Sequence, residues 1–180
     1  MWRVAGTGKR ILVEKPLEIN LNRANALVQA CEAPGVTLAI MLQHRLREAA
    51  LGLAALIKSG ELGALVSATA SVRWWRPQSY YNEPGRGTLA RDGGGVLITQ
   101  AIHTLGMCEV SGDGANPMSF DHGAHRAVLQ DFIRAIQNAT APAVTGRSAL
   151  GMQRVIEAIM TSSQTGRKVW LDPTSLLPVM

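Results

Sequence analysis

Two short apolar runs separated by a helix-like segment constrain the fold more than any other feature of this chain. Residues 11–13 (ILV) are typical of a buried strand, and residues 36–42 (VTLAIML) form a near-continuous apolar run typical of a parallel sheet covered on both faces. Between them, Asn20 can cap a helix that Pro34-Gly35 ends. Four residues of this helix share one apolar face: Ala24, Leu27, Val28 and Cys31. The pattern predicts two parallel strands joined by a helix, and hence an α/β fold.

The rest of the chain predicts a second set of elements. A helix is expected from about residue 47 to 59, with Leu46, Ala50, Leu53 and Ile57 on one stripe and Gly60 at its end. Apolar and polar residues alternate from Val66 to Trp74, which predicts a strand with one buried face in a second sheet. Two helical stripes follow, at positions 128, 129, 132, 133 and 136 and at positions 152, 155, 156, 159 and 160. Gly166 ends the second helix before a last predicted strand, Lys168–Leu171.

Three consecutive glycines precede an apolar run that carries a histidine, in residues 91–103 (RDGGGVLITQAIH). Glycines let a ligand or another backbone segment approach closely, and the first amides of a helix offer donors that lack a partner within the helix. His103 is expected one helical turn after Thr99, on the same face. For this segment alone, a ligand site and a purely structural turn are both open.

Lys15 follows the first predicted strand directly and stands between Glu14 and Pro16. Open α/β sheets bind ligands at the carboxyl ends of their strands, and a proline restricts the residue before it to extended conformations. A ligand-binding lysine and a surface lysine in a turn are both open for this tripeptide alone.

Together, these motifs resemble the Gfo/Idh/MocA family, named after glucose-fructose oxidoreductase, inositol dehydrogenase and rhizopine catabolism. Residues 8–16 (GKRILVEKP), Gln43-His44-Arg45 and the glycine-histidine segment occur in the family's order. Residues 125–136 and 155–171 are similar to the family's last helices and strand. Within the family, residues 72–88 look most like dihydroxyphthalate dehydrogenases.

The resemblance implies a fold and an activity. Residues 1–45 are expected to form the C-terminal part of a Rossmann-type nucleotide-binding domain, and residues 46–180 a shortened α+β sheet domain for substrate and oligomerisation. The implied reaction is hydride transfer between NAD or NADP and a hydroxyl or keto carbon of a small cyclic substrate, such as a sugar, an inositol or an aromatic-acid diol. The implied catalytic residues are Lys15, which holds the oxygen, His103, which transfers the proton, and Thr99, which orients His103 where the family often has aspartate. The implied cofactor-binding residues are Glu14, Lys15, Pro16 and Gln43.

Two parts of the family's pattern are absent from these 180 residues. Ala5–Gly8 offers only Gly-x-Gly, followed by Lys9 and Arg10, and no Gly-x-Gly-x-x-Gly unit follows a strand. A connector rich in turn-forming residues, 111–119, stands where the family has several antiparallel strands. We therefore expect a truncated and impaired enzyme that forms a homo-oligomer through exposed sheet edges. The alternative is a noncatalytic remnant or associating subunit that binds no dinucleotide.

Arginines and aromatic residues are interspersed between positions 73 and 91. Guanidinium groups bind carboxylates and aromatic faces stack on planar ligands, so this segment suits a cyclic or aromatic acid. The predicted substrate-binding residues are Arg86, Tyr81, Trp75 and Gly94. The alternative is that the aromatic residues lie in the core or a subunit contact and the arginines in solvent. We interpret His44, His122 and His125 as structural or surface residues and predict no metal site.

The composition favours small anionic ligands and gives little support to nucleic-acid binding. The net charge is +5, with 18 basic residues scattered among 13 acidic ones. Cys31 and Cys108 match no metal or redox spacing, which favours reduced, mostly buried thiols. Neither a signal peptide nor an apolar run of membrane-spanning length is present, so we expect a cytoplasmic protein without a membrane partner.

Overall fold

The computed structural model describes residues 2–64, 66, 68–69, 71–72, 75–93, 95–105 and 122–172. The first half of the chain forms α1 (Trp2–Ala5), β1 (Ile11–Glu14), α2 (Leu21–Glu32), β2 (Leu38–Met41), the 3₁₀ helix η1 (Gln43–Leu46) and α3 (Glu48–Ser59). Then follow α4 (Gln78–Tyr81), α5 (Leu89–Asp92), the π-helical segment η2 (Leu97–Ala101), α6 (Ile102–Leu105), α7 (Gly123–Gln137) and α8 (Gly146–Thr165).

The predicted strand, helix, strand unit at the start of the chain is confirmed. β1 and β2 pair in parallel, with Ile11 opposite Leu38 and Glu14 opposite Met41. The Asn20 side chain accepts a hydrogen bond from the backbone of Arg23 and caps α2. All four residues of the predicted apolar face of α2 are buried. The described residues therefore form a mixed α/β fold around a two-stranded parallel sheet.

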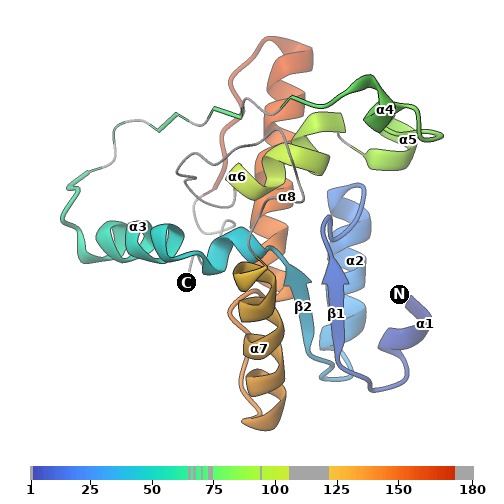
Figure 1. Cartoon of the computed structure of the whole chain (residues 1–180), viewed down its shortest axis with the longest axis vertical. Helices are drawn as coiled ribbons and strands as arrows, with labels where there is room; N and C mark the ends of the chain where they lie inside the picture. Colours follow the sequence, from blue (N-terminus) through green and yellow to red (C-terminus); the bar gives the residue numbers. More distant parts are fainter. Residues whose placement is uncertain are drawn as a thin grey trace.

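The core lies where α2 and α8 pack against each other and against the sheet (Figure 1). Gly146, at the start of α8, permits this packing. A Cβ atom built on it would lie 2.6 Å from Leu38 Cδ2 and 3.2 Å from Val28 Cγ2. α8 ends at Gly166, which has a left-handed backbone conformation, as the sequence predicts. Cys31 is buried and free, while Cys108 lies outside the described residues.

The two later strands that the sequence predicts do not form in the described part of the chain. The described residues between 66 and 72 are not in a strand, and the Val66 side chain is 95% exposed. Residues 168–171 also have no strand pairing, and the Trp170 side chain is exposed. A strand needs a neighbour for its backbone hydrogen bonds. Among the described residues, β1 and β2 pair with each other, and the one further bridge joins Ala39 to Thr145.

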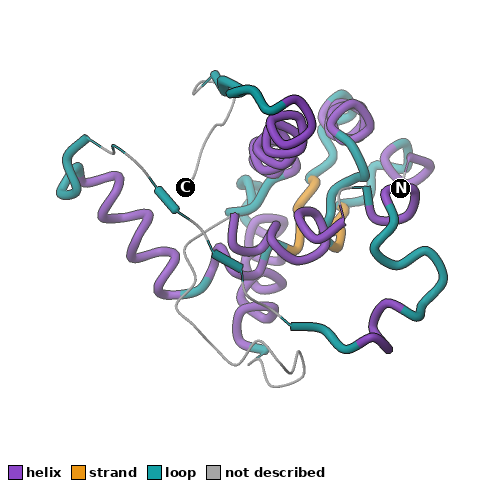
Figure 2. The backbone as a smooth tube through the Cα atoms, turned by 90° about the horizontal axis from the view of Figure 1, so that it is seen from above, coloured by secondary structure: helices purple, strands orange, loops and turns teal. Residues whose placement is uncertain are grey.

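α3 begins and ends close to its predicted bounds but covers less of its apolar surface than expected. Gly60 ends the helix in a left-handed conformation. Ala50 is buried as predicted, whereas Ile57 is exposed. Figures 1 and 2 both show α3 projecting sideways from the body that surrounds the two strands. α7 likewise buries Val128 and exposes Ile133.

Among the described helices, none is both long and apolar enough to cross a membrane.

Candidate functional site

The parallel pairing of β1 and β2 places two predicted motifs at one edge of the sheet. Glu14 and Met41 are the last residues of the two strands and lie opposite each other. Lys15 follows β1, and Gln43 lies two residues beyond β2, at the start of η1. The carboxyl ends of parallel strands are where open α/β sheets bind ligands. Lys15 and Pro16 are partly buried, joined by a cis peptide bond, and Glu14 is exposed.

The segment after the glycines reaches the same edge. Lys15 Nζ donates a hydrogen bond of 2.7 Å to the backbone carbonyl of Thr99, 84 residues further along the chain. The Thr99 hydroxyl donates to the carbonyl of Gly95 at 2.8 Å. Sequence reasoning assigned Thr99 the orientation of His103. In the structure, the Thr99 hydroxyl binds the helix backbone and the Thr99 carbonyl binds Lys15.

His103 lies at the site in contact with a histidine to which the sequence analysis gave no chemical role. The rings of His44 and His103 have centroids 4.6 Å apart and an interplanar angle of 33°. Both side chains are buried. His44 lies three residues beyond β2, next to Gln43, and this position at the carboxyl ends of the strands was the signal that could have identified it.

Burial and neighbouring basic groups keep both imidazoles neutral near neutral pH. Burial, followed by the charge of Lys15, lowers the pKa of His103 to about 2. Burial, Arg47, His125 and Lys15 lower the pKa of His44 to about 4. Burial is also the largest cause that lowers the pKa of Lys15, with Glu14 opposing it. A neutral imidazole can accept a proton, and a nearby ammonium can stabilise a developing oxyanion.

Arg86 lies beside this site and packs against Tyr80, which was not among the predicted site residues. Its guanidinium stacks over the Tyr80 ring at 4.6 Å, and its Nη1 donates to the Tyr80 hydroxyl at 3.3 Å. Buried Gln100 donates to the same hydroxyl at 3.1 Å. Glu83 forms an ion pair with Arg86. Tyr80 thus connects Arg86 to the helical segment that also holds Lys15.

The other predicted substrate residues are more dispersed. Tyr81 is partly exposed and lies near Gly87, where an added Cβ atom would be 3.5 Å from its ring. Trp75 is 66% exposed. Gly94 lies outside the described residues. Its neighbour Gly93 approaches the chain's own backbone, since a Cβ atom there would lie 2.5 Å from the carbonyl oxygen of Ile19.

Gln43 presents a polar atom that could receive a ligand. Its side chain is buried, and its Oε1 has no hydrogen-bond partner. A buried carbonyl oxygen without a donor is costly, and a ligand N–H group can satisfy it. By contrast, the next residue but one, Arg45, donates to Ser148 Oγ at 3.2 Å and joins η1 to α8. Within the described ranges, no group of three or more metal-ligating side chains could hold an ion.

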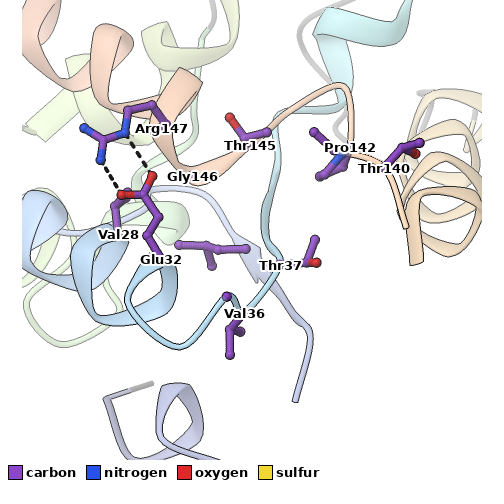
Figure 3. A pocket seen from close by; sticks show the side chains of 12 residues that line it. Val28, Glu32, Val36, Thr37, Thr140, Pro142, Thr145, Gly146 and Arg147 are labelled. Atoms are coloured by element: carbon purple, nitrogen blue, oxygen red, sulfur yellow. Dashed lines mark hydrogen bonds and ion pairs between the residues drawn. The ribbon is translucent and has the colours of Figure 1, made fainter. Parts of the chain in front are cut away.

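A separate cavity of about 330 Å³ lies at the amino end of β2. Val28, Val36 and Leu38 line its apolar wall, and Glu32 forms an ion pair with Arg147 at its side (Figure 3). None of the predicted site residues lines this cavity.

Two family models match most of the second half of the chain. Residues 51–117 match a family model described as the GFO/IDH/MocA C-terminal domain, and residues 117–171 match one described as the oxidoreductase family, C-terminal alpha/beta domain. No curated protein matches the chain.

Several solved structures share the fold. The WlbA dehydrogenase from Bordetella pertussis, in complex with NADH and UDP-GlcNAcA, is 19% identical with a TM-score of 0.76, over 95% of this chain and 75% of that chain. The aldose-aldose oxidoreductase from Caulobacter crescentus, complexed with glycerol, is 20% identical with a TM-score of 0.70, over 94% and 74%. A myo-inositol dehydrogenase from Corynebacterium glutamicum is 15% identical with a TM-score of 0.64, over 96% and 76%.

The fold is therefore one that the chain shares with sugar and inositol oxidoreductases. More specifically, residues 51–171 carry the C-terminal domains of the Gfo/Idh/MocA oxidoreductase family.

Proposed function

We propose that this chain carries the proton-transfer site of an NAD(P)-dependent oxidoreductase that acts on a hydroxyl or keto carbon of a small cyclic substrate. The observation that carries the proposal is the convergence of Lys15 and His103. The Lys15 ammonium is fixed by the Thr99 carbonyl, four residues before His103, and its charge lowers the pKa of that histidine. A cation beside a neutral imidazole suits the removal of a proton from a hydroxyl group.

The residues at the sheet edge fit one end of a nicotinamide cofactor. Gln43 Oε1 is a buried acceptor without a donor, which suits a carboxamide N–H group. The residues proposed to hold the cofactor are Glu14, Lys15, Pro16 and Gln43. Such a cofactor supplies or accepts the hydride. The pyrophosphate end fits less well. The Gly6-Thr7-Gly8 turn precedes β1 and so lies at the amino ends of the strands, whereas Lys15 and Gln43 lie at the carboxyl ends.

In this proposal, the Lys15 ammonium holds the substrate oxygen, and a ring nitrogen of His103 takes the hydroxyl proton. With a pKa of about 2, His103 is a weak base in the chain without ligand. Negative charge that develops on the substrate oxygen opposes the field of Lys15 and makes proton acceptance more favourable. The role of Thr99 is to fix Lys15 through its carbonyl oxygen.

The segment around Arg86 would contact the rest of the substrate. Arg86, Tyr81, Trp75 and Gly94 stay the proposed contacts, with Tyr80 added because it positions Arg86. A guanidinium beside aromatic rings suits a ring that bears a carboxylate, such as a sugar acid or an aromatic-acid diol. The similarity of residues 72–88 to dihydroxyphthalate dehydrogenases supports the second of these.

The proposal is tested by turnover with matched cyclic substrates. The purified chain is incubated with NAD or NADP and with myo-inositol, glucose, glucuronate or a dihydroxyphthalate diol, and nicotinamide reduction is followed by absorbance. We expect turnover that requires both cofactor and a ring hydroxyl, and faster turnover of glucuronate than of glucose. No cofactor-dependent turnover of any of these compounds, with the chain shown to be folded, would favour the noncatalytic alternative.

Cofactor affinity provides a separate prediction. The described residues fit the nicotinamide end of the cofactor but not its pyrophosphate. We therefore expect the dissociation constants of NADH and NADPH to lie above about 10 μM, which corresponds to a binding free energy of roughly 7 kcal/mol. Calorimetric titration of the 180-residue chain measures this constant. Saturable binding much tighter than this limit would mean that residues outside the proposed site bind the pyrophosphate.

A further inference from the structure

His44 stacks on His103, the proposed base, and both side chains are withdrawn from solvent. The two ring centroids lie 4.6 Å apart, and the ring planes are tilted by 33°. So short a separation with so small an angle is typical of stacked rings rather than of rings that meet edge to face. His44 is 5% exposed and His103 is 8% exposed. The His44 ring therefore shields one face of the His103 ring from water.

The 3₁₀ helix η1 fixes the position of His44. The backbone carbonyl of His44 accepts a hydrogen bond of 3.2 Å from the Arg47 amide, and the Arg45 amide donates to the Leu42 carbonyl at 3.0 Å. The buried Arg45 guanidinium donates to Ser148 Oγ at 3.2 Å and so ties η1 to α8. η1 also packs against α6, the helix that carries the proposed base. The stacked ring is therefore part of a connected framework rather than a side chain in a loose turn.

Basic groups face the two histidines from three further segments. These groups are Lys15, directly after β1, Arg47, directly before α3, and His125, in the first turn of α7. Burial is the largest cause that lowers the pKa of both His44 and His103, and the charges of the three basic groups add to it. Because the His44 ring shields His103, it contributes to the burial that acts on the proposed base.

We propose that His44 is a positioning residue for the oxidoreductase reaction, whose ring excludes water from His103 and fixes the orientation of that ring beside Lys15. This inference rests on the proposed function, in which His103 takes the hydroxyl proton. An imidazole can take a proton only while it is unprotonated. Shielding by His44 thus extends, at its acidic end, the pH range in which His103 can act.

NMR titration of the histidine rings tests the shielding without any catalysis. In the 180-residue chain and in His44→Phe, which keeps a planar ring, His103 should not titrate above about pH 4. In His44→Ala and in His44→Gln it should titrate between about pH 4 and pH 6.5, because water reaches the exposed face. His44→Gln keeps a similar side-chain volume without a ring, so it gives the comparison even if His44→Ala does not fold.

Two further variants make the titration specific. The His103 resonance is the one that His103→Ala lacks. His122→Ala removes an exposed histidine just before α7 and should leave the titration of His103 unchanged. If His103 in folded His44→Gln titrates as it does in the parent, His44 does not shield it and the proposal is wrong.

The pH dependence of turnover gives a second readout. Relative to the parent, His44→Gln should lose turnover roughly three- to tenfold between about pH 8 and pH 4.5, because His103 becomes protonated as the pH falls through its raised pKa. His44→Phe should keep a constant ratio to the parent over this range, and neither variant should change the KM of the substrate much. A constant ratio for His44→Gln would overturn the role of His44. No turnover by the parent, with the NMR result as expected, would instead contradict the proposed function.

Discussion

Removal of either Lys15 or His103 is expected to lower the turnover number by roughly 10²- to 10⁴-fold, the usual contribution of a positioned acid, base or electrostatic group. Lys15→Ala removes the cation proposed to hold the substrate oxygen, and His103→Ala removes the imidazole that takes the proton. The measurement is turnover at saturating cofactor and substrate, with this chain alone or with a separate nucleotide-binding partner. Neither variant should unfold the chain.

Two further variants separate chemistry from packing. His122→Ala should retain turnover, because His122 is an exposed residue just before α7. Thr99→Val should have a small effect, because the carbonyl that binds Lys15 stays and only the hydroxyl bond to Gly95 is lost. Equal turnover by His103→Ala and its parent, measured between about pH 6 and pH 9, would exclude proton transfer by His103.

Short-range signals predicted the first part of the fold well. The Asn20 cap, the four-residue apolar face of α2 and the glycines that end α3 and α8 depend on residues within one or two helical turns. The apolar pattern of residues 36–42 indicates a parallel strand. Lys15 directly follows the first strand and so lies where the carboxyl ends of the two strands meet. These features need no information about distant parts of the chain.

The sequence failed where contacts between distant segments decide the structure. The alternation from Val66 to Trp74 is typical of a strand, yet a strand forms only when another segment pairs with it. His44 was interpreted as a structural or surface residue because no acidic or thiol partner stands at metal spacing, and nothing in the sequence indicated its contact with His103. Its contact with His103 joins residues 59 positions apart in the sequence and depends on how η1 and α6 pack. The hydrogen bond from Lys15 to the Thr99 carbonyl could not be predicted either, because every residue type has a backbone carbonyl.

The sequence left open whether the glycine run forms a ligand site or a structural turn. Its first residue, Gly93, packs against another part of the chain's own backbone. Gly93 has a positive φ of 72°, and its position faces the backbone of Ile19. Ile19 lies four residues after Lys15, and Gly93 lies six residues before Thr99. The Ile19–Gly93 approach and the Lys15–Thr99 hydrogen bond therefore hold the same two segments together. Close packing of two backbones thus contributes directly to the position of the proposed catalytic lysine.

Gly93→Ala is accordingly expected to lower the free energy of unfolding by about 2–5 kcal/mol, the sum of backbone strain at positive φ and a steric clash. Gly8→Ala is the matched control, because Gly8 has a φ of 70° but an added Cβ atom there meets nothing within 4 Å. Its cost should be only the strain, about 1–2 kcal/mol. Urea denaturation measures the free energy of unfolding of both variants. The difference between the two losses is the cost of the clash with Ile19. Equal destabilisation by the two substitutions would contradict the close approach of Gly93 to Ile19. If Gly93→Ala also reduces turnover while Gly8→Ala does not, the approach of these two backbones positions the Lys15 ammonium for catalysis.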